Sequence, residues 1–110
     1  MEDSDSVKEV TFDEAVAMSA GGRPRMVWLG REPADRIAGM LGLQAGSIIG
    51  IDAERILRGS ADALGEVRGS VLMCYHGRTS KMVASFLKKS HGIEAYSMKG
   101  GVTSVVGEIF

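Results

Sequence analysis

The sequence predicts an α/β fold in which a parallel sheet carries helices on both of its faces. Short apolar segments of strand type alternate with helix-forming segments from one end of the chain to the other, which is the pattern of a parallel sheet with helical crossovers. The chain has 110 residues, close to the commonest length of a single domain. We therefore expect one domain over residues 7–110, preceded by a disordered acidic tail over residues 1–6.

Five segments have the apolar character of buried strands, and six have helical signals between or after them. The expected strands cover residues 7–10, 26–29, 47–51, 70–73 and 95–98. The expected helices cover residues 12–20, 33–41, 53–58 and 80–90, with a further turn at 61–64 and a last helix at 102–106. Thr11 and Glu14 form a capping box before the first helix, and Asp52 is placed to cap the third.

The helix expected over residues 80–90 has the clearest amphipathic pattern. Its apolar residues recur at helical spacing and predict a core face of Met82, Val83, Phe86 and Leu87. Lysines occupy the opposite face and the last turn, and Gly92 is placed to end the helix.

Composition narrows the classes of function. The hydrophobic fraction of 45% and charged fraction of 25% are those of a soluble globular protein. No apolar run reaches the roughly 20 residues of a membrane span, and the acidic start is unlike a secretory signal, so we expect a cytoplasmic protein. The net charge is -1 and the pI is about 6.1, whereas nucleic-acid binding usually shows a pI above about 9. No nucleic-acid or membrane partner is therefore expected.

Charge and cysteine content point to the second half of the chain. Residues 1–66 hold 12 acidic and 7 basic side chains, whereas residues 67–110 hold 2 acidic and 6 basic ones. This asymmetry favours a site for a small anion in the basic half. Cys74 is the single cysteine, so an intramolecular disulfide and a cysteine-rich zinc site are both excluded. We expect neither a metal nor an organic cofactor.

The segment Cys74-Tyr75-His76-Gly77-Arg78-Thr79-Ser80 joins the strand at 70–73 to the helix at 80–90. In parallel α/β sheets, ligands bind beyond the carboxyl ends of the strands, which is where Cys74 falls. Gly77 permits a positive φ angle, so successive backbone amides can turn inward and form an anion-binding nest beside the helix N-terminus. A thiolate at the centre of that nest is stabilised, which makes a cysteine reactive.

These residues resemble the active-site strand and loop of the rhodanese family, whose loop reads Cys-x-x-Gly-x-(Ser/Thr/Arg)-Ser after an apolar strand. The opening Cys-Tyr-His-Gly is especially similar to bacterial single-domain thiosulfate sulfurtransferases. Residues 98–102, Met-Lys-Gly-Gly-Val, are similar to the family's Leu-x-Gly-Gly-Ile element. The upstream half departs from the family pattern, because Leu29 stands where the family has Asp and residues 39–41 lack its His.

The resemblance implies a rhodanese-like three-layer sandwich and a thiosulfate sulfurtransferase. It implies that Cys74 is catalytic and forms a persulfide, and that the amides of residues 75–80 hold the outer sulfur. The substrate-binding residues would be Tyr75, His76, Gly77, Arg78, Thr79 and Ser80. The donor would be thiosulfate or a similar small anion, and the acceptor would be cyanide, a thiol or a protein.

Three other classes use part of this pattern. A Cys-dependent phosphatase needs Cys-x5-Arg for bidentate phosphate binding, but the sixth residue after Cys74 is Ser80 and Arg78 comes two residues early. The loop is also one residue shorter than those of the rhodanese-like phosphatases and arsenate reductases. Thioredoxin-type chemistry requires a second cysteine, which the chain lacks. A catalytically idle rhodanese-like module for protein binding or sulfur carriage remains the alternative.

Overall fold

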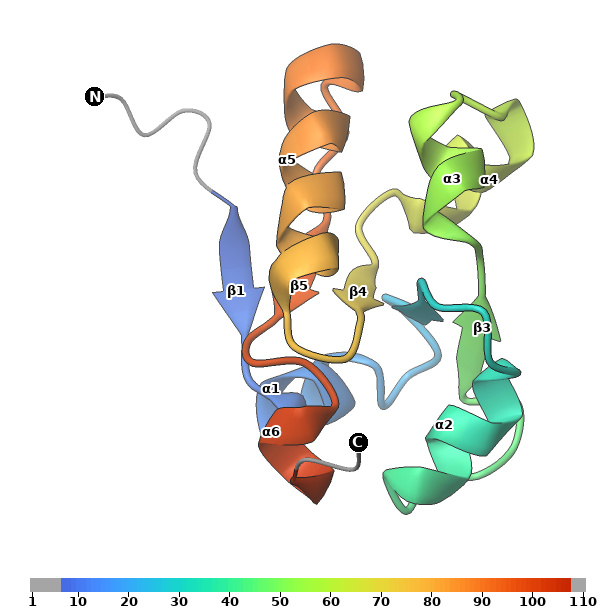
Figure 1. Ribbon diagram of the computed structural model, residues 1–110, viewed down its shortest axis with the longest axis vertical. Helices are drawn as coiled ribbons and strands as arrows, with labels where there is room; N and C mark the ends of the chain where they lie inside the picture. The colour runs from blue at the N-terminus through green and yellow to red at the C-terminus, as the bar shows by residue number, and fades with distance from the viewer. Residues whose placement is uncertain (1–6, 108–110) are drawn as a thin grey trace.

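The computed structural model describes residues 7–107, so the acidic tail expected over residues 1–6 lies outside the described residues, as do residues 108–110. Strands and helices alternate along the chain, as predicted (Figure 1). The strands are β1 (Lys8–Val10), β2 (Met26–Trp28), β3 (Ile48–Gly50), β4 (Val71–Met73) and β5 (Tyr96–Met98). The helices are α1 (Phe12–Met18), α2 (Ala34–Met40), α3 (Ala53–Leu57), α4 (Ala61–Val67), α5 (Arg78–His91) and α6 (Thr103–Val106).

The described strands form one five-stranded sheet in the order β1-β5-β4-β2-β3. Every neighbouring pair is parallel. The strand β4 is therefore central, with β2 and β5 beside it, and the residues that follow β4 leave the sheet at the middle of its carboxyl edge. This is the position at which parallel sheets bind ligands.

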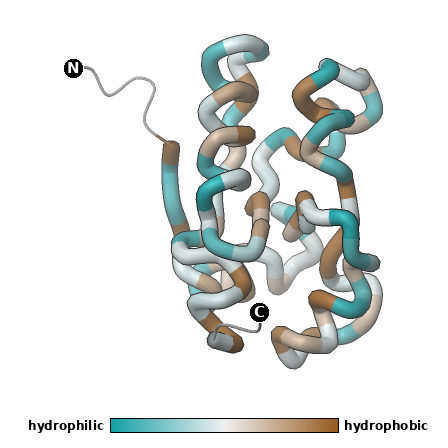
Figure 2. Tube along the Cα trace, viewed as in Figure 1, coloured by the Kyte–Doolittle hydropathy of each residue, from teal (hydrophilic) through white to brown (hydrophobic). Residues whose placement is uncertain are grey.

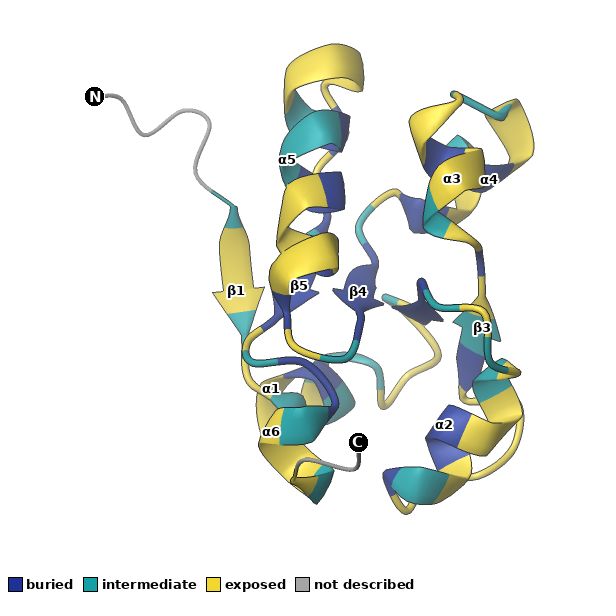
Figure 3. Ribbon diagram, viewed as in Figure 1, coloured by how far each residue is buried: buried dark blue, intermediate teal, exposed yellow. Residues whose placement is uncertain are grey.

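Helices cover both faces of the sheet, so the predicted α/β layering is confirmed. Because side chains alternate along a strand, Leu72 packs with Val27 on one face while its neighbour Met73 packs with Trp28 on the other. The first core includes buried residues of α3, α4 and α5, and the second includes those of α1 and α2 together with Val102, just before α6. Figure 1 shows these two groups of helices on opposite sides of the strands, and Figure 3 shows β4 as fully buried.

Local signals in the sequence act as expected at the helix ends. The Thr11 backbone N–H donates to Glu14 Oε1 at 2.8 Å, and the Glu14 N–H donates to Thr11 Oγ1 at 3.1 Å, which completes the capping box. Asp52 Oδ1 accepts from the Glu54 N–H at 2.9 Å. Gly92 ends α5 in the left-handed region, at a φ of 63°. The short turn expected at 61–64 is a seven-residue helix in the structure.

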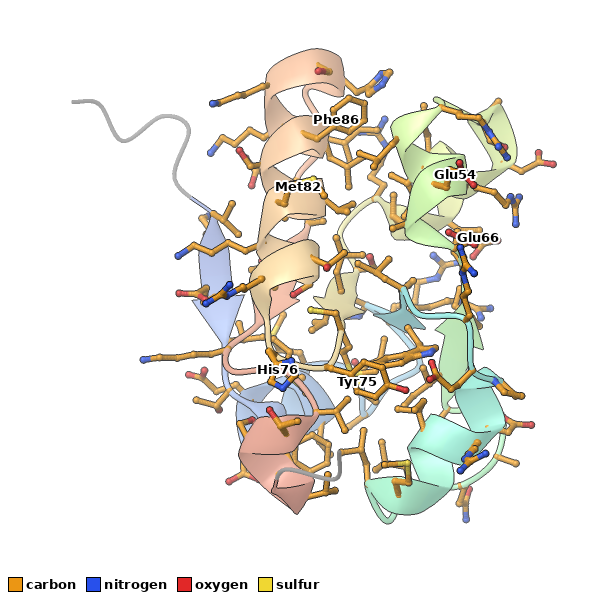
Figure 4. The ribbon with its side chains drawn as sticks, in the orientation of Figure 1. Glu54, Glu66, Tyr75, His76, Met82 and Phe86 are labelled. Atoms are coloured by element: carbon orange, nitrogen blue, oxygen red, sulfur yellow. The ribbon has the colours of Figure 1, made fainter. Side chains whose placement is uncertain are left out.

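Two expectations for α5 are corrected. The helix begins at Arg78, two residues before the predicted start, because the Cys74 sulfur accepts the Ser80 N–H, one of the amides of the first turn. Met82 is 50% exposed and does not belong to the core. The buried face runs through Ser80, Val83, Ala84 and Leu87, which turns Met82 outward and leaves Phe86 half-buried (Figure 4). Figure 2 shows hydrophobic and hydrophilic residues alternating along α5.

No helix within residues 7–107 combines the length and the hydropathy that a membrane crossing requires.

Candidate active site at Cys74

Cys74 follows β4 directly and is held from its backbone. Its carbonyl oxygen accepts the Val102 N–H at 2.9 Å, and the next carbonyl, that of Tyr75, accepts the Thr103 N–H at 2.9 Å. The cysteine is 8% exposed. The sulfur is therefore fixed at the carboxyl edge of the central strand while a small part of the residue reaches solvent.

Two backbone amides of the segment that follows Cys74 donate to its sulfur. The Gly77 N–H donates to Sγ at 3.1 Å and the Ser80 N–H donates to it at 3.3 Å. Gly77 is the N-cap of α5 and has a φ of 90°, a conformation that L side chains rarely adopt. The helix that starts here has 14 residues, so the positive end of its dipole adds to the two amides. Amide donors and a helix N-terminus are the two features that anion sites in proteins share.

A pair of buried hydroxyls lies behind the sulfur. Ser80 Oγ is 3.5 Å from Cys74 Sγ, and it lies 2.6 Å from Ser97 Oγ on β5. Both serines are 0% exposed. Ser80 was among the residues predicted from the sequence, whereas Ser97 was not. The available signal was a serine in the interior of an expected strand, where an apolar side chain is the norm.

The segment Gly100-Gly101 supports the loop from below. An added Cβ at Gly101 would lie 2.5 Å from the Cys74 carbonyl oxygen, and the φ of Gly101 is 67°. An added Cβ at Gly77 would lie 3.1 Å from the Gly100 nitrogen. The two glycine-bearing turns thus touch through their backbones, which explains why both need residues without side chains.

A pocket of about 310 Å3 opens above the sulfur. Its lining consists of Trp28, Leu29, Gly30, Cys74, Tyr75, His76, Arg78 and Thr79. The side chains of His76, Arg78 and Thr79 are exposed at the rim, whereas Gly77 and Ser80 are buried beneath it. All seven residues predicted from the sequence therefore meet at one place. The residues Trp28, Leu29 and Gly30, from the end of β2, complete the apolar wall and were not predicted.

Tyr75 closes one side of this pocket. Its ring meets the Trp28 indole edge-on, with ring centroids 4.9 Å apart. Burial and a hydrogen bond to the Glu32 carboxylate raise the pKa of Tyr75 to about 12. The same hydrogen bond lowers the pKa of Glu32. In Figure 4, Tyr75 and His76 project to different sides of the loop. Glu32 is a residue that sequence analysis missed, since it follows β2 with no motif around it.

The Trp28 indole N–H is a buried donor with no hydrogen-bond partner in the described part of the chain. An added Cβ at Gly30 would lie 2.9 Å from Nε1, so the glycine leaves this edge of the indole uncovered by a side chain. Unmatched buried donors are costly and uncommon in proteins, and this one lies in the wall of the Cys74 pocket.

The chemistry available here is that of one thiol. No group of three His, Cys, Asp or Glu side chains within residues 7–107 is arranged to hold a metal ion. Two other hollows, of about 410 and 660 Å3, are larger, but neither is lined by a cysteine or a histidine. The arrangement at Cys74 supports covalent chemistry by a sulfur nucleophile held at a helix N-terminus.

No protein-family model, no curated protein and no solved structure matches this chain.

Replacing Gly101 with Ala should displace the loop that carries Cys74. The new Cβ would overlap the Cys74 and Tyr75 carbonyl oxygens, and the backbone would be strained at its positive φ. We expect a loss of roughly 2–4 kcal/mol in the free energy of unfolding, measured by urea titration. Gly65→Ala is the matched control: Gly65 lies in α4 with open space around its Cα, so this change should leave stability equal or raise it by up to about 1 kcal/mol. Equal stabilities for the two variants would contradict the close backbone contact.

Replacing Glu32 with Gln should lower the pKa of Tyr75 from about 12 toward its ordinary value. The carboxylate accepts the phenol's hydrogen bond and repels the phenolate, and the variant loses the repulsion while burial remains. Phenolate absorbance after a rapid rise in pH, in a Tyr96→Phe background that leaves one tyrosine, gives the value directly. Because the folded pKa of Tyr75 is raised, its contribution to stability is complete below pH 10 and is lost as the pH rises toward 12. If the pKa of Tyr75 were the same in Glu32→Gln as in the wild type, burial alone would be its cause.

Proposed function

We propose that this protein is a sulfurtransferase of the rhodanese type that carries sulfane sulfur on Cys74. One observation carries the proposal: the sulfur accepts two backbone N–H groups, at 3.1 and 3.3 Å, at the floor of a pocket. A cysteine that served packing alone would need neither the amides nor the opening. The five-stranded parallel sheet with helices on both faces is compatible with a rhodanese-like three-layer sandwich. We propose this fold family for the domain.

Sulfur uptake uses groups that are already in place. The Cys74 thiolate attacks the outer sulfur of thiosulfate, an S–S bond forms to Cys74, and the donor's own S–S bond breaks. The electron pair of the broken bond leaves with sulfite. The negative charge then lies on the outer sulfur of the Cys74 persulfide. We propose that the other amides of the loop and the N-terminus of α5, which begins at Arg78, stabilise this charge.

Sulfur release returns the charge to the cysteine. A nucleophilic acceptor (cyanide in an assay, a thiol or a protein in the cell) attacks the outer sulfur, and the persulfide bond breaks. The electron pair of that bond goes to Cys74 Sγ, which leaves as thiolate. The Gly77 and Ser80 amides that touch Sγ stabilise this leaving group. No metal or organic cofactor enters either step. Since the chemistry depends on a free thiol, we also propose a reducing compartment, the cytoplasm.

The charges around the pocket favour an anionic donor on one side. Arg78 and His76 are exposed at the rim, and Arg78 has no carboxylate partner among residues 7–107. Glu32 lies across the pocket and is bound to the Tyr75 hydroxyl. A dianion is therefore expected to approach from the side of α5, where the helix N-terminus and the Arg78 guanidinium are.

The arginine position that a Cys-dependent phosphatase needs is occupied by a serine. Phosphate binding of that type needs an arginine fork aimed at the cysteine, but the sixth residue after Cys74 is Ser80, whose side chain is buried beneath the sulfur. Arg78 is the first residue of α5 and is exposed.

Thiosulfate should add the mass of one sulfur atom to the wild-type chain and none to Cys74→Ser. The reason is that Cys74 is the single cysteine, so no other side chain holds sulfane sulfur. Intact-mass spectrometry before and after treatment gives the result, and subsequent cyanide should release thiocyanate and restore the original mass. Sulfur on Cys74→Ser would disprove the covalent mechanism. A wild-type protein that gains no sulfur from thiosulfate or from 3-mercaptopyruvate would support the idle binding module instead.

Replacing Arg78 with Ala should raise KM for thiosulfate by roughly ten- to a hundredfold and lower kcat less. A charge-assisted contact to an anion contributes about 1.5–3 kcal/mol, and each 1.4 kcal/mol corresponds to about a factor of ten. Arg78→Lys should recover part of the loss, since the charge remains without the planar fork. Added salt should raise KM for thiosulfate more in the wild type than in Arg78→Ala, because the variant lacks the charge that salt screens.

The matched control for Arg78 is Lys81→Ala. Lys81 is an exposed cation one turn further along α5 and does not line the pocket. Its removal should leave KM within about twofold of the wild type, because screened charges outside the pocket act weakly. Equal KM values for all variants, in steady-state kinetics at two ionic strengths, would show that the amides alone select the anion.

A further inference from the structure

Ser80 and Ser97 form a contact between two buried hydroxyls directly behind the Cys74 sulfur. Their oxygens are 2.6 Å apart, and each residue is 0% exposed. Ser97 lies between Tyr96 and Met98, which pack on the opposite face, so its side chain points toward α5 and meets Ser80 there. Buried hydroxyls are destabilising unless they are hydrogen-bonded. The two serines satisfy this requirement with each other, and either oxygen can be the donor, so the direction of their hydrogens decides what the sulfur receives.

The hydroxyl hydrogens of Ser80 and Ser97 limit which hydrogen bonds can form around the Cys74 sulfur. Each serine has one hydroxyl hydrogen, and its oxygen can also accept. Ser80 Oγ has three neighbours: Cys74 Sγ at 3.5 Å, the Gly77 carbonyl oxygen at 3.4 Å and Ser97 Oγ at 2.6 Å. When Cys74 is a thiol, its S–H donates to Ser80 Oγ, and the Ser80 hydrogen is directed to one of the two oxygens. When Cys74 is a thiolate, the sulfur can only accept.

We propose that Ser97 is a positioning residue that turns the Ser80 hydroxyl toward the sulfur whenever Cys74 is a thiolate. In that state the Ser97 O–H donates to Ser80 Oγ, and the Ser80 O–H donates to Sγ. The sulfur then has three donors: the Gly77 amide, the Ser80 amide and the Ser80 hydroxyl. A hydroxyl that accepts a hydrogen bond is also a stronger donor, so Ser97 acts on the sulfur through Ser80.

The inference rests on the proposed function for its purpose, because sulfur transfer places a thiolate on Cys74 at its start and at its end. The two amides are fixed by the backbone and act on every state of the sulfur. The hydroxyl pair alone can rotate its hydrogens, so it can serve the thiol as an acceptor and the thiolate as a donor. This reversal lets one buried site accommodate both states of Cys74 without an unpartnered group.

Thiolate absorbance of the folded protein, recorded against pH without any sulfur donor, tests the inference. Ser97→Ala should raise the pH midpoint of thiolate formation by roughly 0.5–1 unit, because a hydrogen bond to a charged group is weakened. Ser80→Ala should raise it by at least as much. The double variant should add little to Ser80→Ala, since Ser97 acts through Ser80. The single cysteine makes the signal unambiguous.

Ser70→Ala is the matched control. Ser70 is also buried, at 1% exposure, and its hydroxyl donates to the Val67 carbonyl at 2.7 Å rather than toward the sulfur. This variant should lose stability but keep the wild-type midpoint, and Ser97→Thr, which retains a hydroxyl, should keep it as well. A wild-type midpoint in folded Ser97→Ala, or a full further shift in the double variant, would overturn the inference. Absence of sulfur uptake would instead refute the proposed function and leave the titration result standing.

Discussion

The candidate site depends on the turn that leads from β4 into α5. Gly77 takes a φ of 90° there and directs its N–H to the Cys74 sulfur at 3.1 Å. Because α5 begins at the next residue, the sulfur also receives the Ser80 N–H of the first helical turn. The thiol thus does what a side-chain cap does at other helices, since it satisfies amides that have no partner inside the helix. The contacts that satisfy these helix amides are the same ones that the proposed mechanism uses to stabilise a thiolate.

The sheet gives this turn its rigidity. The strand β4 is central and fully buried, with a helical layer on each face, so the residue before Cys74 is packed on both sides of the sheet. Gly101 brings a second turn against the Cys74 and Tyr75 carbonyls, and the Val102 and Thr103 amides hydrogen-bond to them. The loop is therefore fixed from the strand, from the helix and from the segment after β5. Preorganisation of this kind is what an anion site requires.

Sequence patterns predicted the parts that depend on local chemistry. The capping box at Thr11, the glycine end of α5 and the meeting of residues 74–80 follow from short-range rules. The same rules wrongly placed Met82 in the core. Periodicity alone does not fix the rotation of a helix face to within one residue. Glu32 and Ser97 were missed for another reason. Each acts through a partner far away in the sequence, Tyr75 or Ser80, which only the sheet order brings near.

The polar residues in the core near the sulfur follow a consistent pattern. Apolar side chains at positions 80 and 97 would remove two buried hydroxyls and the cost of their desolvation. The chain instead keeps both hydroxyls, within 2.6 Å of each other and next to the only thiol. Other buried polar atoms of this region, the Gly77 and Ser80 amides, also point to the sulfur. Polar groups gathered around one sulfur atom in an otherwise apolar core are what the proposed persulfide chemistry requires.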